Sequence, residues 1–292
     1  DLMDQAKNLG SIMKFNISER TRNAIMIRME EYVKETHVPE AIRQLMPYMS
    51  IILALTEKYS ALAMNPPYMS RIGMNSQLCA YAQDYYSDSK WDLFAMFMHV
   101  GIDRLLHNGK LGTLNIQSWM FLSSFNDLRH SFINKTHIES LLHLGAHTFD
   151  ELSGEVVQNV AFVVMNGTSN SNAIFYRLVE GVNCNNKKTM FLNREHRYES
   201  IGQNDFSKIP GEPIGYWLDE AWLSLFDNEY LRSFCTPKAG VVTGKDNYFL
   251  RFWFEVSCSD IVPSSPVTKE YGKYHLFQKG GTNIEYYGNG DY

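Results

Sequence analysis

Two consecutive prolines directly after a short apolar stretch constrain the fold of this chain more than any other feature. Residues 60–64 are mostly apolar, and Asn65-Pro66-Pro67-Tyr68 follows them. Proline has no backbone N–H to donate and disfavours a helical residue before it, so neither a helix nor a central strand continues through this sequence. We therefore expect a buried strand over 60–64 that ends in a rigid loop. Such strand ends are where α/β proteins place their chemistry.

Segments of helical and strand character alternate on both sides of this loop. Before it, Ser18 suits the N-cap of a helix to about Lys34 and Pro39 opens another, and both are expected to cover a sheet face. After it, the pattern predicts a helix over 91–107 stopped by Asn108-Gly109, a strand over 111–116, a helix over 124–133, and strands over 138–144 and 160–165. Such alternation is typical of an α/β fold with a parallel sheet.

The later part of the chain predicts an end to the parallel sheet and then a second domain. Asn166-Gly167 favours a hairpin that pairs the strand over 160–165 with one over 173–179. The expected organisation is a helical segment at 1–59 packed on the catalytic domain, a catalytic half at 60–180, a polar linker at 181–214 and a second domain from 215 to 292.

Composition excludes several classes of protein. The chain has 45% hydrophobic and 20% charged residues and a net charge of −5, which is typical of a globular protein and not of one coated with phosphate contacts. The basic cluster Lys187, Lys188, Arg194, His196 and Arg197 is a candidate DNA contact, but a solvated basic loop is the preferred interpretation. Because no apolar run approaches the length of a membrane span, we expect a cytoplasmic protein without a membrane role.

Neither a disulfide framework nor a metal site is expected. The four cysteines are scattered without zinc-ligand spacing, and His99, His107, His143 and His147 are interpreted as structural. The chain begins at Asp1 without a signal peptide, so we expect an internal fragment of a longer protein.

The four residues of the loop match what the methylation of an amino group on a base requires. The lone pair of such a nitrogen is delocalised into the ring, so an enzyme must favour the pyramidal form by accepting hydrogen bonds from its N–H groups. The Asn65 side chain can accept one bond and the Pro66 carbonyl the other, while Pro67 helps to fix the direction of that carbonyl. Tyr68 offers a flat face on which a flipped base can stack.

A stiff turn is the alternative interpretation of this sequence, since Asn and Pro are common turn residues. The pattern of Asp, Asn or Ser followed by two prolines and an aromatic residue arises by chance about 0.01 times in a chain of this length. Its position after an apolar strand further favours the catalytic interpretation.

The chain resembles the gamma-type N6-adenine DNA methyltransferases, and among them the PglX methyltransferases of BREX phage-defence systems. The resemblance covers most of the chain. The segments that carry it are residues 6–11, Asn65-Pro66-Pro67-Tyr68, Lys90-Trp91-Asp92-Leu93-Phe94-Ala95, residues 117–124, 149–151, 154–158 and 240–251, and Lys279-Gly280-Gly281.

This resemblance implies a Rossmann-like class I methyltransferase sheet and S-adenosylmethionine as the cofactor. It implies double-stranded DNA as the substrate, with the target adenine flipped out, and other phage-defence proteins as partners. Asn65, Pro66, Pro67 and Tyr68 would form the catalytic motif, with Asn65 also beside the cofactor, and Phe149 would sandwich the adenine against Tyr68. The region from 215 would begin a target-recognition domain.

The chain departs from the family in its cofactor motif. A glycine-rich turn and the acidic residue after the next strand should both precede Asn65, and neither is present in residues 1–64. We therefore expect a partial sheet that lacks its N-terminal cofactor half, and a fragment that is inactive by itself. Two other functions stay open: methylation of an amino group on RNA or protein, and a DNA-recognition module with little turnover.

Overall fold

The computed structural model describes residues 2–35, 37–149, 157–169, 171–199, 202–236, 244–262 and 274–277. The chain divides into two compact units, residues 1–229 and 230–292. The predicted start of a second domain near Gly215 thus falls inside the first unit. None of the helices in the described residues is long and apolar enough to cross a membrane.

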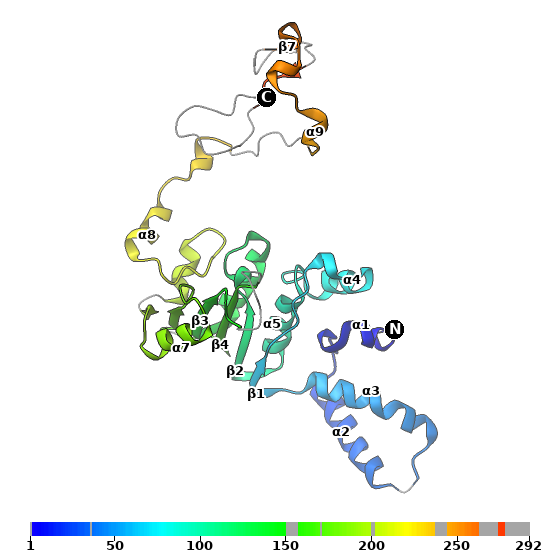
Figure 1. Ribbon diagram of the computed structural model, residues 1–292. Helices are drawn as coiled ribbons and strands as arrows, with labels where there is room; N and C mark the ends of the chain where they lie inside the picture. The colour runs from blue at the N-terminus through cyan, green and yellow to red at the C-terminus, as the bar shows by residue number, and fades with distance from the viewer. Residues whose placement is uncertain are drawn as a thin grey trace. The chain divides into compact units, whose positions relative to one another are not determined.

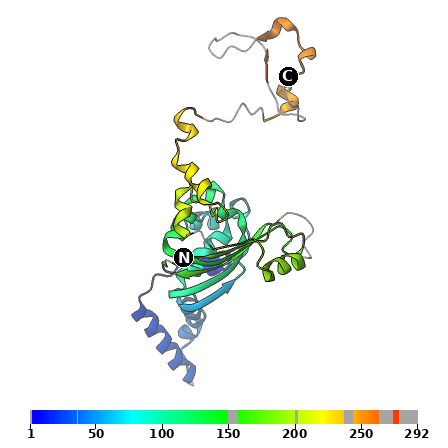
Figure 2. The ribbon, with the colours of Figure 1, turned by 90° about the vertical axis from the view of Figure 1, so that its left-hand side faces the viewer.

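The first unit is built on one mixed sheet of six strands in the order β1-β2-β4-β3-β5-β6. The strands are β1 (Tyr59–Met64), β2 (Leu105–Ile116), β3 (Thr136–Gly145), β4 (Asn159–Asn166), β5 (Ile174–Arg177) and β6 (Arg197–Tyr198). Strands β1 and β2 are parallel, as are β3 and β5, whereas β4 is antiparallel to both β2 and β3 (Figures 1 and 2). The predicted α/β class is confirmed, with a mixed sheet in place of the parallel one.

The predicted hairpin between β4 and the next strand is wrong. Strand β4 lies between β2 and β3, with Phe162 opposite Thr113 on one side and Leu141 on the other. Both of its edges are therefore occupied, and β5 pairs instead with the free edge of β3, where Leu141 faces Phe175. The apolar pattern predicted the strands but carried no information about which edges they share.

Two apolar clusters in the first unit hold several of its helices, and the first of them includes the sheet. The helices are α1 (Ala6–Leu9), α2 (Glu19–Lys34), α3 (Glu40–Thr56), α4 (Ser76–Tyr85), α5 (Leu93–Asp103), α6 (Asn126–Lys135), α7 (Cys184–Leu192) and α8 (Glu220–Ser224). The first cluster joins α5 and α6 to the sheet around Trp119, which is fully buried, and the second joins α1, α4 and α5 around Ile12 and Tyr86. The second unit contains α9 (Asp246–Phe249) and the strand pair β7 (Ile261–Val262) and β8 (Tyr274–His275).

Helix α5 ends earlier than the sequence predicted. It stops at Asp103, and residues from Leu105 onward belong to β2. The register between β1 and β2 jumps from Leu105 to Lys110, so the residues between them bulge from the strand. Asn108 has a φ of 61°, and a Cβ on Gly109 would lie 2.9 Å from the Tyr59 carbonyl oxygen. Asn108-Gly109 therefore forms a turn within the strand instead of a helix stop.

The N-terminal helices form as predicted but are not buried. Ser18 caps α2 by accepting a hydrogen bond from the Thr21 N–H, and α3 begins directly after Pro39. Neither helix contains a buried residue, so the prediction that they cover a face of the sheet is wrong. Strand β1 likewise has no buried residue and is an edge strand, which corrects the expectation of a buried one.

The stretch predicted as a polar linker packs into the first unit. Residues 181–214 include α7, and Phe206, Ile209 and Ile214 are buried. Tyr216 is also fully buried and stacks on Phe175 of β5, with ring centroids 4.8 Å apart. Widely spaced apolar residues in a polar sequence therefore anchor this segment to the sheet.

Candidate active site

The Asn-Pro-Pro-Tyr sequence forms the loop directly after β1. Asn65 follows Met64, the last residue of the strand, and Met64 pairs with Thr113 of β2. Pro66 is buried, whereas the side chain of Asn65 is exposed and Tyr68 is half-buried. The polar groups of the motif therefore lie at the carboxyl end of a strand with a neighbouring parallel strand, where α/β folds bind ligands.

Asp92 holds the far side of this loop. One oxygen of its buried carboxylate accepts hydrogen bonds from the N–H groups of Met69 at 3.1 Å and Phe94 at 3.2 Å, so it also caps α5. The Leu93 N–H donates to the Met69 carbonyl at 2.9 Å. Burial raises the pKa of Asp92, and the hydrogen bonds from backbone N–H groups oppose that shift. The loop is thereby tied to the start of α5, which limits its freedom to move.

Tyr68 is fixed by both its ring and its hydroxyl. The ring meets Phe94 edge-on, with centroids 6.3 Å apart and planes at 83°. The hydroxyl lies 3.1 Å from Asn65 Oδ1 and 3.0 Å from the carbonyl oxygen of Leu114 in β2. Burial raises the pKa of Tyr68, so at neutral pH the phenol keeps its proton and can donate it.

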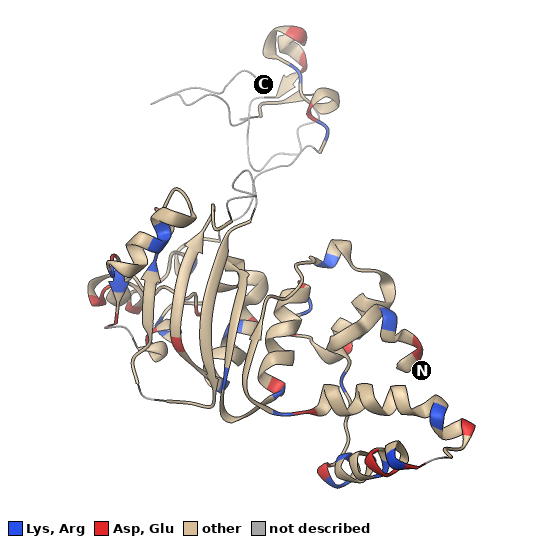
Figure 3. Cartoon of the chain, turned by 60° about the horizontal axis from the view of Figure 1, so that its bottom comes forward, with Lys and Arg blue, Asp and Glu red and all other residues tan. Residues whose placement is uncertain are grey.

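A shallow hollow of about 520 Å³ opens beside Asn65 on one face of the sheet. The small residues Ala63, Gly112, Ser140 and Ala161 line it from four neighbouring strands, and Leu114 and Leu142 add apolar surface. In Figure 3 this part of the sheet is seen with no helix in front of it and few charged residues. The hollow falls within the size range of small-molecule sites.

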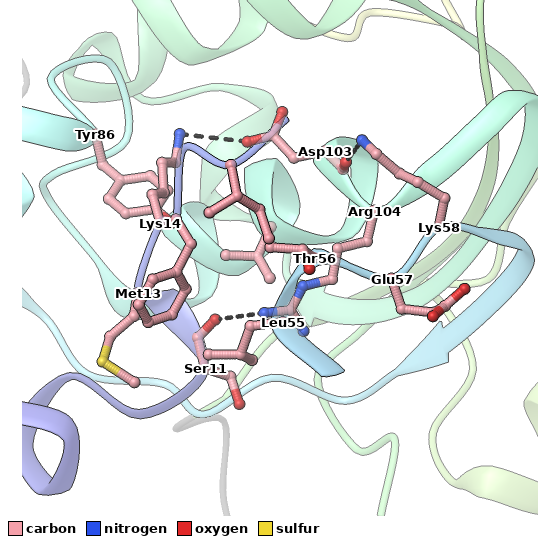
Figure 4. A pocket seen from close by; sticks show the side chains of 13 residues that line it. Ser11, Met13, Lys14, Leu55, Thr56, Glu57, Lys58, Tyr86, Asp103 and Arg104 are labelled. Carbon is pink, nitrogen blue, oxygen red and sulfur yellow. Dashed lines mark hydrogen bonds and ion pairs between the residues drawn. The ribbon is translucent and has the colours of Figure 1, made fainter. Parts of the chain in front are cut away.

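Another hollow, of about 310 Å³, lies at the opposite end of β1. Charged side chains that line it bind to each other or to backbone carbonyls. Lys14 forms an ion pair with Asp103 at 3.3 Å, and Arg104 donates to the Ser11 carbonyl at 2.9 Å (Figure 4). Lys58, which precedes β1, lines this hollow, whereas Asn65 follows β1. The length of the strand therefore separates it from the predicted catalytic residues.

Two residues singled out from the sequence are not brought to the loop by any contact in the described part of the chain. Phe149 follows β3 and is 41% exposed, and its role against Tyr68 stays a prediction. Lys187 is buried, and its ammonium donates to the carbonyls of Leu144 at 2.7 Å and Leu178 at 2.9 Å. Desolvation lowers its pKa. Lys187 therefore supports the backbone and is removed from the candidate DNA-contact cluster.

His143 has a structural place, as predicted. It is buried in β3, its Nε2 donates to Gln117 Oε1 at 2.6 Å, and its Nδ1 accepts from the Tyr216 hydroxyl at 2.9 Å. Burial, with help from Arg177 and Lys187, lowers the pKa of His143 to about 4. Within the described residues no group of three His, Cys, Asp or Glu side chains could hold a metal ion.

No glycine-rich turn precedes Asn65 in residues 1–64. Gly10 is the only glycine before Asn65. It has a φ of 54° and follows α1 as the first residue of a short 3-10 helix. A Cβ added there would have nothing within 4 Å, so Gly10 is not a strand-to-helix turn around a ligand. Asn65 was the residue predicted to lie beside the cofactor, and its position at a strand end fits that role.

Sequence reasoning missed two residues of this site. Asp92 was placed in the predicted helix over 91–107 and in a segment that carries the resemblance, but its bond to Met69 across the loop has no local signal. Asn159 is fully buried at the start of β4, and its Nδ2 lies 3.5 Å from the Tyr68 hydroxyl. A polar residue at the head of a strongly apolar strand was the available signal for Asn159.

A family of methylases matches the part of the chain that contains the Asn-Pro-Pro-Tyr loop. The sequence model of the family described as "Eco57I restriction-modification methylase" matches residues 5–149. Among solved structures, the methyltransferase subunit of a type I restriction-modification system from Streptococcus thermophilus aligns with a TM-score of 0.39 and 14% identity, covering 53% of this chain and 37% of that one.

Two curated relatives match almost the whole chain. The adenine-specific methyltransferase BrxX of Escherichia coli strain HS is 38% identical over 100% of this chain and 24% of its own length. The adenine-specific methyltransferase PglX of Lacticaseibacillus casei strain Zhang is 31% identical over 97% of this chain and 25% of its own length. The resemblance to PglX-type methyltransferases predicted from the sequence is confirmed. The chain spans about a quarter of the length of these relatives.

Proposed function

We propose that this chain carries the target-base side of a site-specific DNA adenine-N6 methyltransferase that acts in phage defence or restriction-modification. The observation that carries the proposal is the placement of Asn65 and Pro66 at the carboxyl end of β1, beside an open hollow on the sheet. The two adenine-specific relatives support the choice of adenine, because their similarity extends over the whole chain.

Asn65 and Pro66 supply the hydrogen-bond acceptors in this proposal. A carboxamide oxygen has two lone pairs, so Asn65 Oδ1 can accept from the Tyr68 hydroxyl, 3.1 Å away, and from one N–H of the adenine amino group. The Pro66 carbonyl accepts the other N–H. Both bonds strengthen as the nitrogen becomes pyramidal, which lowers the barrier to attack on the methyl group. S-adenosylmethionine is the methyl donor that we propose, and Asn65 is the residue of this chain that we propose beside it.

Tyr68 and Phe149 are the residues that we propose for holding the flipped adenine. Tyr68 is anchored at its hydroxyl and edge-on against Phe94, so its remaining ring face is presented in a fixed orientation. An exposed aromatic such as Phe149 is suited to the opposite side of a base. The region after residue 215 is proposed to begin target recognition, which distinguishes a DNA enzyme from one that methylates RNA or protein.

The comparison of Asn65→Ala with Tyr68→Ala in the intact protein tests this assignment. Asn65→Ala removes an acceptor used in the chemical step, so we expect turnover to fall about 10²- to 10³-fold while DNA affinity stays near that of the wild type. Tyr68→Ala removes a stacking face worth about 1–3 kcal/mol, so base capture should weaken together with turnover. Methylation rates and DNA affinities are measured at one fixed salt concentration. Near-normal methylation by Asn65→Ala would show that this loop is not the catalytic centre.

A further inference from the structure

The hydroxyl of Tyr68 makes contacts that a stacking face does not need. Its oxygen lies 3.1 Å from Asn65 Oδ1, 3.0 Å from the Leu114 carbonyl oxygen and 3.5 Å from Asn159 Nδ2. Two of these atoms are acceptors and Nδ2 is a donor, while the phenol has one proton to give and lone pairs to receive. The hydroxyl therefore joins Asn159 to Asn65 across the ends of three strands.

Asn159 is a polar side chain that is fully buried at the start of a strand. It is 0% exposed at the first residue of β4, opposite Ile116 at the end of β2. Its Oδ1 is buried without a hydrogen-bond partner in the described part of the chain, so the amide is not there to satisfy a neighbouring donor. Burying such a group costs free energy. The contact of its Nδ2 with Tyr68 is the one that ties Asn159 to the loop.

The direction of the hydrogen bonds determines what Asn159 does. Because Nδ2 can only donate, it occupies a lone pair of the Tyr68 oxygen, and the single phenolic proton is shared between Asn65 Oδ1 and the Leu114 carbonyl oxygen. Burial raises the pKa of Tyr68, which keeps that proton on the phenol at neutral pH. Asn65 is exposed, and its carboxamide would otherwise turn freely and present nitrogen as readily as oxygen.

We propose that Asn159 is a positioning residue that acts through the Tyr68 hydroxyl to hold the Asn65 carboxamide with its oxygen toward the target amino group. This role rests on the proposed function, because it concerns the acceptor that Asn65 provides. It assigns Tyr68 two separable tasks, stacking by the ring and orientation of Asn65 by the hydroxyl.

A double-mutant cycle in the intact protein tests the proposal. Tyr68→Phe keeps the ring and removes the hydroxyl, and Asn159→Ala removes the amide. Each should lower kcat about threefold to tenfold, the range expected for one net hydrogen bond, with the KM for DNA unchanged. The double variant should be no slower than Tyr68→Phe alone, because Asn159 has no effect once the hydroxyl is absent.

Asn115→Ala is the matched control. Asn115 is also 0% exposed and lies on β2, but its side chain contacts Thr113, at 3.2 Å, and not Tyr68. Any loss of kcat caused by Asn115→Ala should therefore multiply with the loss caused by Tyr68→Phe.

Fluorescence of 2-aminopurine at the target position should rise equally on binding to wild type and to Tyr68→Phe, since the stacking ring is kept. Asn159→Leu, which keeps the branched shape of the side chain without its hydrogen-bonding atoms, replaces Asn159→Ala if the latter does not fold.

Two results would overturn the positioning role. The first is a wild-type kcat in Tyr68→Phe or in a folded Asn159 variant. The second is an Asn159 substitution that lowers kcat by the same factor in the wild type and in Tyr68→Phe. The outcome is distinguishable from failure of the proposed function. If Asn65→Ala is inactive while the Tyr68→Phe and Asn159 variants match the wild type, only the positioning role fails. If Asn65→Ala methylates normally, the proposed function itself fails.

Discussion

The buried His143 makes the stability of the first unit depend on pH in a defined direction. Its pKa is lowered from 6.5 to about 4 in the folded chain, chiefly by burial. The unfolded state therefore binds a proton that the folded state does not, and the free energy of unfolding falls as the pH decreases from 6.5 toward 4. One pKa unit corresponds to about 1.4 kcal/mol, so His143 accounts for a loss of about 2 kcal/mol between pH 7 and pH 5.

Urea unfolding of wild type and His143→Gln at pH 7 and pH 5 measures this contribution. Fluorescence of Trp217, whose ring centroid lies 6.2 Å from that of His143, reports on this region. Glutamine does not titrate, so His143→Gln should lose about 2 kcal/mol less than the wild type over this interval. His130→Gln, at a histidine whose side chain is 68% exposed, is the matched control. Equal pH dependence of wild type and His143→Gln would refute the reasoning.

Substitutions at two further residues test the hydrogen bonds that hold the loop and the core. Asp92→Ala removes the cap of α5 and the bond to Met69, so the free energy of unfolding should fall by about 2 kcal/mol in the same urea assay. Asp92→Asn keeps an acceptor, so its free energy of unfolding should fall by less than half as much. Arg129→Met should cost about 3 kcal/mol or more in that assay, because the carbonyls of Trp119, Leu122 and Gly211 each lose a buried donor. A loss below about 1 kcal/mol, the scale of one net hydrogen bond, would contradict this role of Arg129.

Local sequence predicted those features that depend on neighbouring residues. The cap at Ser18, the strand before Asn65 and the strands β3 and β4 follow from side-chain chemistry and periodicity within a few residues. The position of Asn65 at a strand end was predictable for the same reason, since two prolines terminate a strand wherever it lies.

Features that depend on pairing between distant segments were not predictable in this way. The insertion of β4 between β2 and β3 depends on which sheet edges are free, and residues from Leu105 onward pair with β1 instead of continuing α5. Asn159 is 91 residues from Tyr68 in sequence, so nothing near either residue indicates their contact. The polar stretch at 181–214 was expected to be a linker because its few apolar anchors are diluted by Asn, Lys and Arg.

The identity of the methylated product tests the central claim most directly. The intact protein is incubated with labelled S-adenosylmethionine and, in parallel, with double-stranded DNA, RNA and protein, and the digested products are separated by chromatography and mass spectrometry. We predict label in N6-methyladenine from DNA, formed about 10²- to 10³-fold more slowly by Asn65→Ala. Label confined to RNA or protein, or N6-methyladenine formed equally by Asn65→Ala, would contradict the account.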